Sequence, residues 1–136
     1  MFCRIVRGEA TAAVVYRDDA VVAFLDILPA APGHTLVVPR VHVEEVYELD
    51  EETAAGVMRG VVRVARAIRR ALAPPGLSVL QRNGRVAGQA VPHLHVHLIP
   101  RRPGDGVGLV LHQQRAPQAE LEEVAARLRQ ALEPLA

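Results

Sequence analysis

The sequence predicts an α+β domain on a five-stranded antiparallel sheet, with one long central helix and a C-terminal helix. Five short runs have strand character, most links between them are short, and helical periodicity is confined to two segments. Short links favour hairpin pairing of neighbouring strands, which gives an antiparallel sheet. With 136 residues, half of them hydrophobic, the whole chain (1–136) is expected to form a single domain with a proper core.

The strand predictions rest on β-branched and aliphatic runs bounded by turn residues. In chain order the predicted segments are a short helical or irregular lead-in at 2–7 and strands at 12–16, 20–25, 35–38, 77–81 and 93–98. The turn Arg17-Asp18-Asp19 makes the first two strands a hairpin. The run 35–38 is apolar on both faces, which is typical of a central strand, and Pro39 ends it.

The long helix has clear start and stop signals. Asp50 is the expected N-cap, two glutamates follow in the first turn, and Pro74-Pro75 end the helix. Its predicted buried stripe is Val57, Val61, Val64, Ile68 and Leu72. Arg59, Arg63, Arg66 and Arg70 lie on other faces; an anion site is possible there, but an ordinary solvated face is the preferred interpretation. A second amphipathic helix is predicted over 117–132, with Leu121, Val124, Leu128 and Ala131 on its apolar side.

Composition excludes several classes of function. A net charge of +1 and a chain with two Tyr, two Phe and no Trp argue against a nucleic-acid polymer as partner, but not against a mononucleotide. No apolar run approaches the ~20 residues of a membrane span, and residues 1–9 lack the apolar core of a secretory signal. One cysteine, Cys3, permits no internal disulfide, which favours a cytoplasmic location.

The most informative stretch is 92–100, in which three histidines alternate with aliphatic residues between two prolines. Alternation predicts a half-buried strand, with Leu94, Val96 and Leu98 facing the core. His93, His95 and His97 would then form a row on the opposite face, about 6.5 to 7 Å apart at each step.

Three interpretations of this row compete. It is a polar strand face that happens to be rich in histidine, a metal site, or a set of imidazoles acting on phosphorus with one of them as nucleophile. The register with an apolar counterpart disfavours the first, and the strand alone does not separate the other two. The loop 82–89 directly before the row carries two glycines and could wrap a phosphate through backbone N–H groups.

The stretch 88–100 resembles the signature of the histidine-triad (HIT) family of nucleotide hydrolases and transferases. The family pattern is His-X-His-X-His-X-X with X hydrophobic, and here a Gly-Gln pair precedes it. The segments 2–9, 23–27 and 32–40 also resemble family segments, in the same order. The resemblance is closest to the bacterial branch of the purine-nucleoside phosphoramidase-like subgroup.

The resemblance implies catalytic roles for four histidines. His95, the middle histidine of the motif, would be the nucleophile on the α-phosphate of a nucleotide. His93 and His97 would orient it and bind the phosphate, and His34 would lie behind them as a supporting partner. A neutral imidazole is a competent nucleophile near pH 7, and the resulting nucleotidyl-histidine splits one difficult displacement into two easier ones.

The resemblance also implies substrate-binding residues and a quaternary structure. Asp26 would hold the ribose hydroxyls and Ile27 would lie against the base, while Asn83, Gln89 and the loop at Gly88 would contact the phosphate. From the residues alone, Asp26 is explained equally well as a turn-capping aspartate. The implied assembly is a homodimer in which two half-sheets join into one continuous sheet, each protomer binding a purine nucleotide of the AMP or GMP type.

Two residues depart from the family pattern. Many relatives have Ser or Thr where this chain has Ala90, and that hydroxyl is thought to help the leaving group depart. Many bacterial relatives also begin with Cys-X-X-Cys, which binds a structural zinc with histidines. Only Cys3 of that pair is present in this sequence. A tetrahedral site would lack one protein ligand, so we expect no bound zinc and no other cofactor.

The predicted function is that of an enzyme releasing nucleoside monophosphates from phosphoramidates, acyl-nucleotides or dinucleoside polyphosphates. The first alternative is a nucleotide-binding sensor or scaffold with little catalysis, which Ala90 keeps open. The second is a metal-dependent hydrolase with His93 and His95 as ligands and His34 or His42 as a further one.

Overall fold

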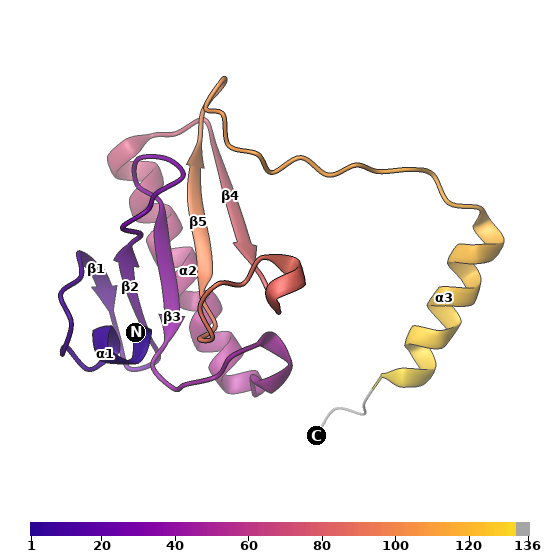
Figure 1. The fold of residues 1–136 in the computed structure, drawn as a ribbon, viewed down its shortest axis with the longest axis horizontal. Coiled ribbons are helices and arrows are strands. Elements are labelled where there is room, and N and C mark those ends of the chain that lie inside the picture. The colour runs from indigo at the N-terminus through magenta and orange to yellow at the C-terminus, as the bar shows by residue number, and fades with distance from the viewer. Residues whose placement is uncertain (133–136) are drawn as a thin grey trace.

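A computed structural model of the chain describes residues 1–132 and shows one antiparallel sheet covered by helices, with a helix extending away from it (Figure 1). The elements in order are α1 (Phe2–Val6), β1 (Val14–Arg17), β2 (Val21–Leu25), β3 (Thr35–Pro39), a 3-10 turn (Val46–Glu48), α2 (Glu51–Leu72), β4 (Gly76–Gln81), a second 3-10 turn (Arg85–Ala87), β5 (Val96–Arg101) and α3 (Gln118–Ala131).

The sheet has the strand order β1-β2-β3-β5-β4, and all neighbouring strands are antiparallel. The predicted α+β class, the five-stranded antiparallel sheet and both principal helices are therefore confirmed. The run at Thr35–Pro39 is buried throughout and pairs with β2 on one side and β5 on the other. That is the central position expected from its apolar character on both faces.

The two faces of the sheet support separate hydrophobic cores. On one face, Val21, Ala23 and Val37 pack beneath the buried stripe of α2. On the other, alternate residues of the same strands, such as Val22 and Phe24, pack against α1. Both faces of β2 and β3 are therefore buried. Helix α1, predicted only as a short helical or irregular lead-in, covers the face opposite α2.

Helix α2 begins and ends where its sequence signals place it. The Asp50 carboxylate accepts a hydrogen bond of 2.7 Å from the Thr53 N–H. Gly60 brings the helix close to β2, because a Cβ there would lie 2.7 Å from Cγ2 of Val21. Four of the five predicted stripe residues are buried, but Leu72 is exposed at the last turn, so that part of the prediction is wrong. The arginines on its other faces are exposed, as expected for a solvated surface.

The histidine strand is shorter than predicted. It begins at Val96, so only His97 of the three histidines lies in β5. Pairing between β3 and β5 stops at Val37 and Val96; in that register Pro39, which has no N–H to donate, would face Leu94. The N–H of Leu94 instead donates to the carbonyl of Val43. The predicted division of faces still holds, because Leu94, Val96 and Leu98 all belong to the core beneath α2.

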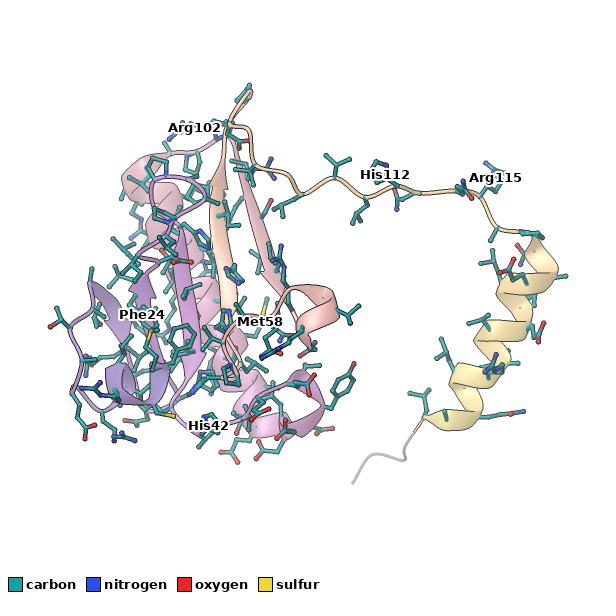
Figure 2. All side chains as sticks on the ribbon, in the orientation of Figure 1. Phe24, His42, Met58, Arg102, His112 and Arg115 are labelled. Atoms are coloured by element: carbon teal, nitrogen blue, oxygen red, sulfur yellow. The ribbon has the colours of Figure 1, made fainter. Side chains whose placement is uncertain are left out.

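Helix α3 follows an extended segment that carries His112 and Arg115 away from the sheet (Figures 1 and 2). The helix forms where it was predicted, but Leu121, Val124 and Leu128 are exposed, so no described residue covers its apolar side. Among residues 1–132, no helix is both long and apolar enough to cross a membrane.

Candidate active site

The first residue of the site is His97, which lies in β5 between the neighbouring strands β3 and β4. His97 lies opposite Leu36 of β3 and Leu80 of β4 in the central part of the sheet. His95 precedes β5, yet its ring lies 4.8 Å from that of His97, measured between centroids. The two rings are therefore neighbours on one side of the chain, as expected for residues two positions apart.

The hydrogen bond made by His95 determines which of its nitrogens is free. Its Nδ1 lies 2.7 Å from the backbone carbonyl of His93. A carbonyl only accepts, so Nδ1 carries the proton and donates it. In the neutral ring Nε2 then holds the lone pair, which makes it the available nucleophilic nitrogen.

A chain of hydrogen bonds through His34 fixes the opposite tautomer in His97, with the proton on Nε2 instead of Nδ1. The N–H of Ala30 donates to Nδ1 of His34 over 3.0 Å, so the proton of the neutral His34 ring is on Nε2. That Nε2–H lies 2.9 Å from Nδ1 of His97 and donates to it. His97 therefore carries its own proton on Nε2. The site pairs a nucleophilic nitrogen on His95 with an N–H donor on His97.

The first histidine of the row faces a different group of side chains. Nε2 of His93 donates to the carbonyl of Pro39 over 3.1 Å, which leaves Nδ1 as an acceptor. Nδ1 of His42 lies 3.2 Å and Sγ of Cys3 lies 3.5 Å from that nitrogen, and the sulfur is 3.3 Å from His42. Figure 2 shows His42 at the end of the sheet nearest α1 and the start of α2.

The Cys3, His42 and His93 donors suit zinc by type and supply three of the four positions of a tetrahedral site. Within residues 1–132, His95 belongs to no such group of three donors. A second group of possible donors is Asp26, His34 and His97, and His93 and His95 share neither group, so the metal-dependent hydrolase with those two ligands stays an alternative that this grouping does not support.

Burial lowers the pKa of three histidines, His34, His93 and His97. It lowers the pKa of His97 to about 4, with further lowering from His95, His34 and Arg82 nearby. Burial also lowers the pKa of His34, which Asp26 partly opposes, and the pKa of His93, which its bond to the Pro39 carbonyl partly opposes. Desolvation disfavours the imidazolium in each case.

The predicted ribose and base residues lie at the end of β2. Oδ2 of Asp26 is 3.6 Å from Nε2 of His34, and its Oδ1 accepts from the N–H of Leu28. The carboxylate thus caps a turn and also lies beside the histidine relay, and its contact with ribose hydroxyls stays a prediction. Ile27, the next residue, is 82% exposed.

The predicted phosphate loop is held by its own amide side chains. Oδ1 of Asn83 accepts from the Val46 N–H, and its amide exchanges hydrogen bonds with Gln81. Gln89 is buried, with Oε1 accepting from Gly84 and Nε2 donating to the carbonyls of Glu44 and Val91. Both side chains hold the loop in this structure, and their contact with phosphate stays a prediction, as does that of Gly88.

Sequence reasoning missed several contributors to the site. Phe2 of α1 packs edge-on against His95 and His93, with ring centroids 5.2 and 5.9 Å apart. The Ala30 N–H and the Pro39 carbonyl, which set two of the tautomers, are backbone groups and carry no residue-type signal. Arg82 lies beside His97, and only its place one residue after a strand could have suggested this.

A row of histidines entering an inner strand, supported by a fourth histidine directly before the neighbouring strand, is the arrangement of a histidine-triad protein. Residues 7–104 match the family model described as the HIT domain. The chain therefore belongs to the HIT family.

Individual relatives agree with this assignment. The chain is 49% identical over 111 residues to protein hit of Bacillus subtilis, covering 81% of this chain and 77% of that protein. It is 39% identical over 109 residues to the adenosine 5'-monophosphoramidase hnt1 of Schizosaccharomyces pombe, covering 80% and 78%. The crystal structure of a HIT-family protein from B. subtilis matches with a TM-score of 0.94 at 40% identity, covering 99% and 98%.

The lowered pKa of His97 makes stability depend on pH. Below its ordinary pKa of 6.5, the unfolded chain binds more protons than the folded one, so the free energy of unfolding rises with pH until about pH 6.5. His97 alone should remove about 2 kcal/mol of stability between about pH 7.5 and pH 5. Denaturant titrations at both pH values should show this loss, and His97→Gln, which keeps an acceptor for His34, should show a smaller one. An equal loss in that variant would contradict the shift.

Proposed function

We propose that the protein is an enzyme that transfers a nucleoside monophosphate to His95 and then to water or another acceptor. The observation that carries this proposal is the bond from His95 Nδ1 to the His93 carbonyl, which leaves Nε2 free beside the N–H of His97. Similarity to the relative named adenosine 5'-monophosphoramidase supports a nucleotide as substrate.

The proposed reaction has two displacements at phosphorus. Nε2 of His95 forms a bond to the α-phosphorus while the bond to the leaving group breaks, and an amine leaving group takes up a proton as it departs. His97 Nε2–H donates to a phosphoryl oxygen and stabilises the charge that develops there. Water then attacks the same phosphorus, loses a proton, and releases the nucleoside monophosphate from His95.

The nucleotide would lie along the end of β2. Asp26 is proposed to accept from the ribose hydroxyls, and the exposed Ile27 to contact a purine base. His93, His34, Asn83, Gly88 and Gln89 keep their proposed roles in orienting His95 or in binding phosphate. A cytoplasmic location belongs to the same proposal and rests on the single cysteine.

Replacement of the nucleophile should separate catalysis from binding. We expect His95→Ala to slow turnover of an adenosine phosphoramidate at least a thousandfold, about 4 kcal/mol of barrier, with AMP affinity largely kept. Intact-protein mass spectrometry after an alkaline quench should detect one AMP adduct on the wild type and none on the variant.

The matched control is His112→Ala, which removes a histidine on the extended segment far from the sheet. It should keep wild-type turnover and the adduct. Turnover of His95→Ala within tenfold of wild type would refute the assignment. AMP binding with neither adduct nor turnover in the wild type would favour the alternative function, a nucleotide-binding sensor or scaffold.

The reaction is proposed to need no metal, because His95 belongs to neither group of possible metal donors and His97 offers an N–H that can stabilise the developing charge. Protein stripped by a chelator and checked by elemental analysis should keep its turnover. Cys3→Ser should change kcat by less than about threefold, since the thiol touches no reacting atom. Loss of activity on chelation with recovery on added zinc would overturn this view.

We propose a homodimer formed through β4. This strand is an edge of the sheet, and its exposed Val79 lies beside Met58 and Val62 of α2 in an apolar groove of about 500 Å³. A second copy would pair with the edge and cover the groove. Light scattering should give twice the monomer mass for the wild type and the monomer mass for Val62→Glu. Val15→Glu on the opposite edge strand is the control and should stay dimeric.

A further inference from the structure

Arg82 lies on the same face of the sheet as His97. It follows Gln81, the last residue of β4, and in strand alternation it shares the face of Leu80, which lies opposite His97. Arg82 lines a cavity of about 390 Å³ together with His34, His97 and the loop 106–109. This cavity adjoins the proposed catalytic pair but is not used by the mechanism above.

The Arg82 side chain packs against Gly88, in the loop 82–89 that leads to the histidines. A Cβ on Gly88 would lie 2.9 Å from Nη1 of Arg82 and 3.2 Å from its Cδ. The backbone of Gly88 has a φ of +96°, which also favours glycine. Glycine at this position therefore leaves room for the Arg82 side chain to pack against the loop.

The guanidinium has no anionic partner in the described part of the chain. No hydrogen bond or ion pair joins it to another residue within 1–132, and the residues lining the cavity include no Asp or Glu. By contrast, Arg101 is held by Asp105 and Ser78, and Arg102 donates to the Leu72 carbonyl. Arg82 is thus a cation with five donors facing a cavity, and its charge reaches His97.

The position of Arg82 indicates which part of a substrate it would meet. His97 contacts the ring of His95 and also lines this cavity, whereas His95 does not line it. A group that is attached to an α-phosphate at His95 and extends past His97 into the cavity would therefore meet Arg82. The guanidinium then lies beside the group attached to the α-phosphate.

We propose that Arg82 binds an anionic leaving group, so that the preferred substrates are nucleotides whose α-phosphate is joined to a second acid group, sulfate or phosphate, rather than to an amine. This inference rests on the proposed function of the same site. Guanidinium groups bind such oxyanions through paired N–H donors.

The chemistry of departure agrees with this substrate class. An amine must gain a proton to leave, and Ala90, where many relatives have a hydroxyl, offers none. A sulfate or phosphate leaves as an oxyanion: the P–O bond breaks, its electron pair stays on the leaving oxygen, and the bond from His95 Nε2 to phosphorus forms. No proton has to reach the leaving group in that step, and Arg82 stabilises the departing charge.

The test compares three substrates that share the adenylate and differ in the leaving group: adenosine 5'-phosphoramidate, adenosine 5'-phosphosulfate and diadenosine tetraphosphate. We expect Arg82→Gln to lower kcat/KM about tenfold or more for the two anionic leaving groups and less than about threefold for the phosphoramidate. Arg82→Lys, which keeps the charge but not the paired donors, should fall between. Arg115→Gln, which removes an exposed arginine on the extended segment away from the sheet, is the control and should match the wild type.

An equal loss on all three substrates would overturn the proposal, because Arg82 would then act on the shared α-phosphate or on folding. No loss on any of them would overturn it as well. Thermal melting and circular dichroism of each variant check the fold.

A binding measurement keeps this proposal separate from the catalytic one. Calorimetry with ADP and AMP uses the second phosphate as the probe for the anionic group. We expect wild-type protein to bind ADP about tenfold or more tightly than AMP, and Arg82→Gln to lose that preference. If the wild type prefers ADP but turns over no substrate, the proposed enzymatic function is refuted and the anion site is not. If the wild type binds ADP and AMP with equal affinity, the anion site is refuted and the enzymatic function is not.

Discussion

The hydrogen bond from His95 to the carbonyl of His93 decides the chemistry of the whole site, because it selects the nitrogen that is free to react. It exists because the chain leaves regular strand geometry before Val96. Where β3 reaches Pro39 the ladder loses a donor, and the backbone of residues 93–95 turns to other partners. The missing N–H of Pro39 thus allows the backbone arrangement in which the His93 carbonyl accepts the Nδ1 proton of His95.

The polar site is stable because its groups are neutral or paired in the folded protein. Burial disfavours charge on His34, His93 and His97, and each has a hydrogen-bond partner that fixes its proton. Among the described residues, no buried side-chain polar atom is left without a partner. The core beneath α2 and the packing of α1 hold the same segment from opposite faces, so the imidazoles are fixed by two hydrophobic layers.

Much of the fold could be predicted from local pattern, and much of the site could not. Alternation in 93–98 correctly assigned Leu94, Val96 and Leu98 to the core, and Asp50 and the double proline bounded α2. The bounds of β5 were missed because they depend on a partner strand more than fifty residues away. The amides of Asn83 and Gln89 look identical in sequence whether they bind phosphate or hold a loop. Phe2 and Arg82 reach the histidines only through the register of the sheet.

The groups that set the tautomers in this site are parts of the main chain: the N–H of Ala30 and the carbonyls of Pro39 and His93. Main-chain groups are supplied by every residue type, apart from the N–H that proline lacks. The positions of the protons in the site therefore depend on the path of the backbone, and at position 30 the side chain itself takes no part. Position 30 would tolerate any residue that keeps the turn, with proline as the exception.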